Sequence, residues 1–162
     1  MDDASKSRRK FLVIADDSPE FGAALRYACR RARSTGGHVA LLRVIAPAQF
    51  EHWSGVRDEI ERQERAEAEV LLHDLADRVI AETGLPPEFI IKHAESTRAA
   101  VRAVVAGDPD IKILILATST GGRGPGPLVS AIAKEGVGWS GRKLPVTVVP
   151  GDLTDEEIED LA

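Results

Sequence analysis

Residues Ile113 to Ser130 read Ile-Leu-Ile-Leu-Ala-Thr-Ser-Thr-Gly-Gly-Arg-Gly-Pro-Gly-Pro-Leu-Val-Ser, and this stretch decides the fold class of the chain. Its first part, Ile113 to Ala117, is an unbroken apolar run without polar alternation. Such a run is typical of a strand buried on both faces of a parallel sheet. Pro127 suits the first turn of a helix, because its missing N–H needs no partner there. The stretch therefore predicts a strand, a glycine-rich loop and a helix in succession.

The loop between this strand and this helix has the composition of an anion cradle. Glycines let backbone N–H groups turn toward a phosphate, hydroxyl groups add donors, and a helix N-terminus favours negative charge. A long connection that needs glycine for its turns is an equally good interpretation. The candidate phosphate-binding residues are Thr118, Ser119, Thr120, Gly121, Gly122, Gly124 and Ser130, with Arg123 as a further phosphate partner.

The composition narrows the class of protein. The chain has 162 residues, 43% of them hydrophobic and 29% charged, and is expected to form one globular domain. A net charge of −5 argues against general nucleic-acid binding. No apolar run approaches the roughly 18 residues of a membrane span. The single cysteine, Cys29, excludes an internal disulfide, is expected to be an inert packing residue, and makes the cytoplasm the expected compartment.

Strand and helix patterns alternate along the chain. This alternation predicts an α/β fold with a five-stranded parallel open sheet, doubly wound, with right-handed crossovers and helices on both faces. The expected strands are 10–15, 39–45, 89–92, 113–117 and 146–149. The expected ends of the domain are a disordered tip over residues 1–9 and an acidic tail over residues 151–162, the latter with one or two helical turns from which Leu153, Ile158 and Leu161 pack back.

Two of the expected helices carry specific predictions. Ser18 is expected to cap the first helix with Pro19 at its first position, and Gly36 and Gly37 to end it. The second and longest helix spans about residues 56–83. Its expected inward residues are Val56, Ile60, Val70, Leu71, Leu75 and Val79.

Ligands of such sheets bind at the carboxyl ends of the strands, where the chain direction switches. The first strand ends at Asp16 and Asp17, which meet the glycine-rich loop if the first and fourth strands are neighbours. We interpret Asp16 as a functional residue and Asp17 more simply as a cap of the first helix. Both carboxylates are also candidates to hold Mg²⁺ beside a nucleotide.

The chain resembles the universal stress proteins. The similarity lies in residues 11–20, Phe-Leu-Val-Ile-Ala-Asp-Asp-Ser-Pro-Glu, in the long second helix, in Ile113 to Ala117 and in Leu144 to Val149. It covers residues 10–150 and implies a Rossmann-like sheet, akin to adenine nucleotide alpha hydrolases, with strand order 3-2-1-4-5. It also implies that Asp16 contacts adenine or ribose of ATP or another adenine nucleotide carrying Mg²⁺, and that the strand ending at Val44 lines the base. The strand Leu144 to Val149 would pair with its twin in a homodimer.

The glycine-rich loop departs from the motif of the family's ATP-binding members, which is Gly-x-x-Gly, nine residues, then Gly-Ser or Gly-Thr. Gly121 and Gly124 match the first pair, but Lys134 and Glu135 stand at the spacing of the second. Aligning the helix instead places Ser130 on the family's serine and Val129 on the preceding glycine. A β-branched side chain there would approach the phosphates.

Three functions fit these features. The first is a stress-response homodimer that binds an adenine nucleotide without dedicated catalysis, because no catalytic set appears in the sequence. The second is a weak Mg²⁺-dependent ATPase that uses Asp16 or Asp17. The third is a nucleotide-free dimeric module with unknown protein partners. Phe50, His52 and Trp53 are candidates to stack a base, cover the crevice, contact a partner or fold back on the sheet edge.

Overall fold

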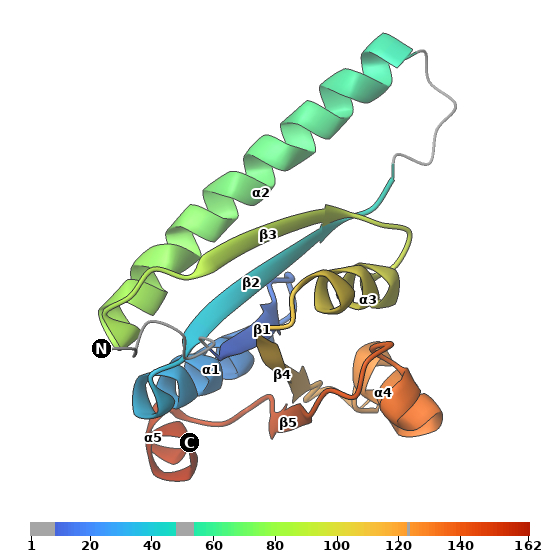
Figure 1. The fold of residues 1–162 in the computed structure, drawn as a ribbon. Helices are drawn as coiled ribbons and strands as arrows, with labels where there is room; N and C mark the ends of the chain where they lie inside the picture. The colour runs from blue at the N-terminus through green and yellow to red at the C-terminus, as the bar shows by residue number, and fades with distance from the viewer. Residues whose placement is uncertain (1–8, 48–53, 123) are drawn as a thin grey trace, which may run out of the picture.

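The computed structural model describes residues 9–47, 54–122 and 124–162. These residues form a parallel sheet in the order β3-β2-β1-β4-β5, flanked by helices, as predicted (Figure 1). The strands are β1 Lys10–Ile14, β2 His38–Ile45, β3 Glu88–His93, β4 Ile111–Thr118 and β5 Val146–Pro150. The helices are α1 Phe21–Thr35, α2 Ser54–Thr83, α3 Thr97–Gly107, α4 Pro127–Glu135, the short 3-10 helix η1 Gly136–Gly138, and α5 Asp155–Leu161.

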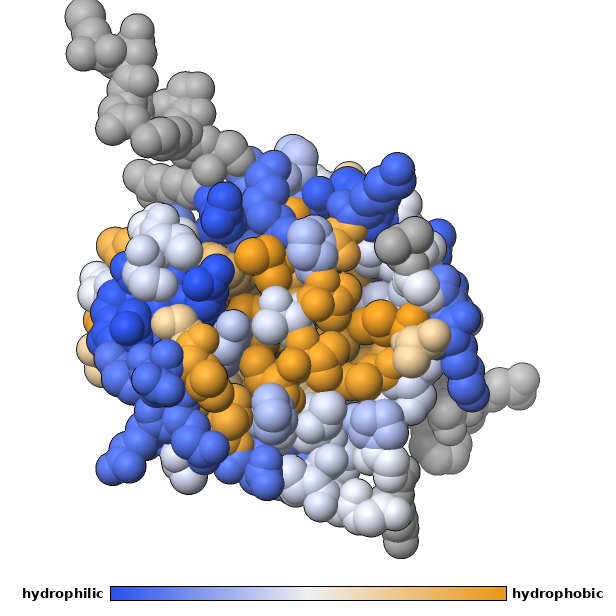
Figure 2. Space-filling model, turned by 90° about the horizontal axis from the view of Figure 1, so that it is seen from below, coloured by the Kyte–Doolittle hydropathy of each residue, from blue (hydrophilic) through white to orange (hydrophobic). Residues whose placement is uncertain are grey.

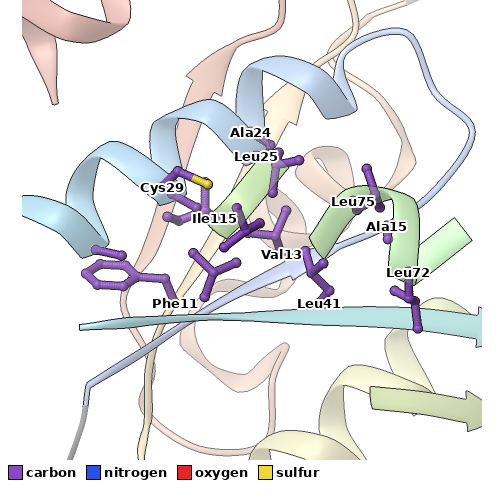
Figure 3. Close-up of a cluster of buried hydrophobic side chains, with 14 residues drawn as sticks. Phe11, Val13, Ala15, Ala24, Leu25, Cys29, Leu41, Leu72, Leu75 and Ile115 are labelled. Carbon is purple, nitrogen blue, oxygen red and sulfur yellow. The ribbon is translucent and has the colours of Figure 1, made fainter. Parts of the chain in front are cut away.

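Both faces of the sheet are buried under helices, which explains why its strands are apolar without alternation. On one face, Phe11 and Val13 of β1 pack against α1 and α2 (Figure 3). On the other, Leu12 and Ile14 pack against α3 and α4. Cys29 belongs to the first cluster, where burial raises the pKa of its thiol to about 12, so it is an inert packing residue as predicted.

The start of α1 differs from the prediction. The helix begins at Phe21, and the residue before it, Glu20, makes no side-chain cap. Ser18 instead turns back toward Asp16, whose carboxylate accepts hydrogen bonds from both the N–H and the hydroxyl of Ser18. The predicted Ser18 cap is wrong because this local turn competes with helix capping for the same hydroxyl. Gly36 ends the helix in the left-handed conformation, as expected.

The predicted inward face of α2 is confirmed in part: Leu75 and Val79 are buried, but Val56 and Val70 are not. Val56 and Val70 are 47% and 62% exposed, whereas Leu72 is fully buried. The inward face repeats at Ala68, Leu72, Leu75 and Val79, a helical spacing that leaves Val70 outside it. The N-terminal part of α2 runs out beyond the sheet, so Val56 has no core to pack against (Figure 1). Within the described chain, no helix combines the length and apolar character needed to cross a membrane.

The acidic C-terminal segment folds back as α5. Thr154 and Glu157 form a capping box at its start, and Leu153 and Ile158 are buried against Val149. Acidic side chains of α5 meet arginines of α1, with Arg26 Nε 2.7 Å from Asp155 and Arg33 Nη2 2.9 Å from Glu159. Leu161 was also expected to pack back, but it is 62% exposed because α5 ends there and its last turn is uncovered.

An apolar surface surrounds β5 and α4 (Figure 2). We define this α4/β5 face by Ile132, Leu144, Val146 and Val148; the first three pack only partly into the core, and Val148 is 40% exposed. None of the residues of α4, all of which the structure describes, is buried. Strand β5 lies at the end of the sheet, so its outer backbone groups have no neighbouring strand among the described residues.

Gly151, which follows β5, lies against the carboxyl end of β4. A Cβ atom at this position would lie 2.6 Å from Cβ of Glu20 and closer still to the backbone oxygen of Thr118. We expect Gly151→Ala to lower the free energy of unfolding by about 1–3 kcal/mol, as overpacking typically does. Urea unfolding measures this change. Gly107→Ala is the control, because a Cβ there meets nothing within 4 Å; equal effects of the two variants would contradict the close packing.

Lys10 joins two carboxylates at the amino-terminal edge of the sheet, with Nζ 2.6 Å from both Glu88 and Asp108. Partial burial opposes ionisation of Asp108, but the hydrogen bonds from Lys10 and from the N–H of Asp110 outweigh it and lower the pKa of Asp108. Because the pKa of Asp108 is lower in the folded protein than in the unfolded chain, its ionisation stabilises the fold at pH values above the pKa of the unfolded chain. This stabilisation is lost as the pH falls through the pKa of the folded protein.

We therefore expect Asp108→Asn to lower the free energy of unfolding by about 1 kcal/mol at neutral pH. The difference between the two proteins should shrink as the pH drops below about 4, where the free carboxyl becomes protonated. Urea titrations at neutral and acidic pH measure it. A difference that stays constant with pH would show that the charge of Asp108 is not its cause.

Candidate functional site

A cavity of about 210 Å³ lies at the carboxyl ends of β1 and β4. These strands are neighbours, but β1 leads to β2 on one side of the sheet and β4 to β5 on the other. This is the switch point at which parallel sheets bind ligands. The cavity is lined by Ile14, Asp16, Ser18, Glu20, Phe21, Ala24, Ile115, Leu116, Ala117, Pro125, Gly126, Pro127, Leu128 and Val129.

Asp16 is a fixed acceptor at the mouth of this cavity. One carboxylate oxygen accepts the N–H of Ser18, at 3.0 Å, and its hydroxyl. The other oxygen makes no hydrogen bond to any residue that the structure describes, and the side chain is exposed. Asp16 is therefore oriented by its neighbour while keeping one oxygen free to accept a hydrogen bond from a ligand.

The opposite wall of the cavity comes from the start of α4. Gly126 precedes the helix with φ 101°, a conformation that favours glycine, and Pro127 is the first helical residue as predicted. The N–H of Ser130 donates to the oxygen of Gly126 at 3.0 Å, which places Ser130 inside the helix rather than at its tip. Val129 lines the cavity.

One hydrogen bond closes the glycine-rich loop on itself: the N–H of Ser119 donates to the oxygen of Pro125 at 3.1 Å. The hydroxyl of Thr118 instead accepts the N–H of Gly151, which follows β5, at 3.4 Å. The other candidate phosphate-binding residues are exposed and do not line the cavity; they are Thr120, Gly121, Gly122 and Gly124. Arg123 and the aromatic candidates Phe50, His52 and Trp53 lie outside the described residues.

Asp17 and Val44 lie together in a separate groove, between the end of β2 and α2. Asp17 does not cap α1, contrary to our simpler interpretation, because Arg43 draws its carboxylate away. Arg43 Nη2 lies 3.3 Å from Asp17, and Nη1 donates to the oxygen of Ala15 at 2.9 Å. Of the predicted site residues, Asp16 is the one that lines the cavity.

Sequence reasoning missed the contribution of α1. Glu20 and Phe21 line the cavity beside Asp16, and the side chain of Glu20 makes no hydrogen bond or ion pair with the residues described. A helix that starts directly after a strand end brings its first turn to the same edge, which is a signal for such residues. No group of three or more His, Cys, Asp or Glu suited to a metal ion occurs among the described residues.

Comparison with protein-family models matches residues 7–126 to the universal stress protein family. The chain belongs to this family. A comparison with curated proteins finds no match. The solved structure of universal stress protein UspA from Lactobacillus plantarum has a TM-score of 0.69 and 18% identity, covering 87% of this chain and 97% of its own.

Two further universal stress proteins were solved with adenine nucleotides. One, in complex with cAMP, has a TM-score of 0.62 and 15% identity, covering 90% of this chain and 98% of its own. The other, from Archaeoglobus fulgidus in complex with dAMP, has a TM-score of 0.56 and 16% identity, covering 87% and 97%. At these identities the likeness establishes the shared fold.

The observed start of α4 changes which residues can be aligned with the family's phosphate motif. The structure places Gly126, and not Val129, directly before the helix. The residue after Gly126 is Pro127, which has neither a hydroxyl nor a backbone N–H. The alignment of Ser130 with the family's serine is therefore not supported by its place in the helix.

Proposed function

We propose that this universal stress protein is a cytoplasmic stress-response protein that binds an adenine nucleotide in the cavity between β1 and β4, without dedicated catalysis. The observation that carries the proposal is Asp16, an oriented carboxylate with one free oxygen at the switch point of the sheet. A ribose hydroxyl is a natural donor to such an oxygen. The cAMP and dAMP complexes of the two relatives support an adenine nucleotide as the ligand.

The apolar part of the cavity suits a base. Ile14, Leu116, Leu128 and Val129 lie on its walls, and most ligand pockets combine such walls with a few polar groups that fix orientation. Asp16 and Glu20 are the carboxylates that a Mg²⁺ ion carried by a nucleotide would meet.

Binding without turnover is favoured by the side chains present. The polar side chains among the described lining residues are those of Asp16, Ser18 and Glu20, and these include no histidine or lysine to act as a base near neutral pH. One carboxylate oxygen of Asp16 is already engaged by Ser18. The lining thus resembles a binding site more than a catalytic one.

We further propose that the protein forms a homodimer through the strand Leu144 to Val149. The α4/β5 face is apolar, and β5 presents an unpaired strand edge within it. Such edges pair with another chain unless they are protected by charge or covered. Two copies of β5 placed side by side would pair these edges and cover Val148.

Titration calorimetry with AMP and with Mg²⁺-ATP, combined with a phosphate-release assay, tests the binding proposal. Acid extraction of a separate sample of the purified protein identifies any nucleotide already bound. We expect saturable binding and no phosphate release. Release of phosphate from ATP would favour the weak ATPase, and absence of both binding and release would favour the nucleotide-free interaction module.

A further inference from the structure

Helix α1 presents a row of arginines to the C-terminal segment of the chain. Arg26, Arg30 and Arg33 are four and three residues apart, so they lie on one side of the helix. We call these three residues the arginine face. They line a cavity of about 180 Å³ together with Glu82 of α2 and residues of α5. Helix α5 lies beside α1 and covers this face (Figure 1).

Helix α5 brings two carboxylates to the arginine face. Asp155 Oδ1 lies 2.7 Å from Nε of Arg26. Glu159 Oε1 lies 3.2 Å from Nε of Arg30 and 2.9 Å from Nη2 of Arg33. Apart from α5, the described lining of this cavity holds the three arginines and a single carboxylate, which α2 contributes. The arginine face without α5 is therefore a positively charged surface that fits an acidic ligand.

The ion pairs with α5 satisfy the arginines incompletely. The Nε atoms of Arg26 and Arg30 are buried, yet they make no hydrogen bond to any residue that the structure describes. The carboxylates are largely in solvent, with the side chain of Asp155 79% exposed and that of Glu159 62% exposed. Exposed ion pairs add little stability and are weakened by salt. Helix α5 therefore covers the arginine face without being held tightly by its charges.

The apolar contact of α5 is small as well. Ile158 is the buried residue of this helix, all of which the structure describes. With Leu153 and Val149 it forms a cluster separate from the two clusters on the faces of the sheet. A helix of 7 residues is too short to be stable in isolation, so α5 depends on its docked position. These contacts suit an element that another helix can replace.

We propose that the arginine face binds an acidic amphipathic helix of another protein, and that α5 occupies the face in the free protein as a competitor. The partner helix carries the pattern that docks α5, which is an apolar residue between acidic residues, as Ile158 lies between Asp155 and Glu159. A longer helix is more stable by itself and pairs with the same arginines. The tether of α5 sets the affinity that such a partner must exceed.

NMR titration of the isotope-labelled full chain with a peptide of residues 152–162 tests the proposal. Ile158→Lys undocks α5, because it removes the buried apolar side chain and adds a charge that the arginines repel. We expect saturable shifts of the amides of the arginine face in this variant. The unaltered protein should need at least about tenfold more peptide, because its own α5 competes at an effective concentration on the order of 1 mM.

Two matched controls accompany this titration. Leu161→Lys adds the same charge at a position of α5 that is 62% exposed, and it should titrate like the unaltered protein. A peptide with Asp155→Asn and Glu159→Gln should bind the Ile158→Lys protein about threefold or more weakly, because it cannot form the ion pairs. Equal binding of the two peptides, or no saturable shifts in Ile158→Lys, would overturn the proposal. An oligonucleotide that binds this variant more tightly than the acidic peptide would overturn it in favour of a nucleic-acid surface.

Amide hydrogen exchange of the unaltered protein tests the detachment of α5 without any substitution. The N–H of Ile158 donates to the oxygen of Thr154 at 3.0 Å, and this bond breaks when α5 opens. We expect this amide to exchange at least about 100-fold faster than the amides of β1, because α5 opens while the sheet stays folded. Equal protection would make α5 an integral part of the fold and overturn its role as a competitor. A dimer that dissociates in Ile158→Lys would show that two copies exchange α5 and would overturn binding of another protein.

Discussion

Asp16→Ala is expected to weaken adenosine and AMP binding by about 10- to 100-fold, the largest loss that we predict at the site. The variant removes the free carboxylate oxygen that would accept a ribose hydroxyl. A hydrogen bond to a charged group contributes about 1.5–3 kcal/mol, which corresponds to that range of affinity. Calorimetric titration of the variant measures the loss.

Two controls separate this loss from other effects. Asp17→Ala removes the neighbouring carboxylate, which pairs with Arg43 outside the cavity, and should leave affinity nearly unchanged. Urea unfolding of Asp16→Ala checks the fold, since the alanine also removes the acceptor for the N–H of Ser18. If Asp17→Ala weakened binding as much as Asp16→Ala, the ligand would lie in the groove of Asp17 instead.

The second large effect concerns the proposed dimer. Val148→Lys places a charge on the α4/β5 face, on a strand that lies at the edge of the sheet. Lysine on an edge strand opposes pairing with another chain. We expect the dissociation constant of the dimer to rise by about 100-fold, so that the variant sediments as a monomer at micromolar concentration.

Val70→Lys is the matched control for this variant. Val70 is 62% exposed on α2, and the substitution adds the same charge. Helix α2 packs on β2 and β3, at the opposite end of the sheet from β5. It should leave the oligomeric state unchanged. A Val148→Lys protein that remains dimeric, or an unaltered protein that is already monomeric, would contradict pairing through β5.

The fold was predictable because its signals are local. Apolar runs such as Ile113 to Ala117 indicate buried parallel strands, and Pro127 and Gly36 lie at helix ends as their backbone preferences require. Details that depend on packing were not predictable in the same way. Val56 is apolar like Leu72, but it is 47% exposed because the N-terminal part of α2 runs out beyond the sheet.

The site was predictable in part. Asp16 follows a buried strand at the switch point, so its position follows from strand order. Glu20 and Pro125 line the cavity because α1 and the loop before α4 approach each other in three dimensions, which no local pattern encodes. The composition of the glycine-rich loop resembles a phosphate cradle, but the N–H of Ser119 is bonded to the oxygen of Pro125, and Thr120, Gly121, Gly122 and Gly124 do not line the cavity.

The central claim is that the cavity between β1 and β4 holds the adenine nucleotide. Amide chemical-shift mapping by NMR during titration with AMP tests it most directly. The account predicts saturable shifts that centre on Asp16, Phe21 and Leu128, three lining residues from separate segments. Shifts that centre instead on Val44 and Arg43 in the neighbouring groove, or no saturable shifts at all, would contradict it.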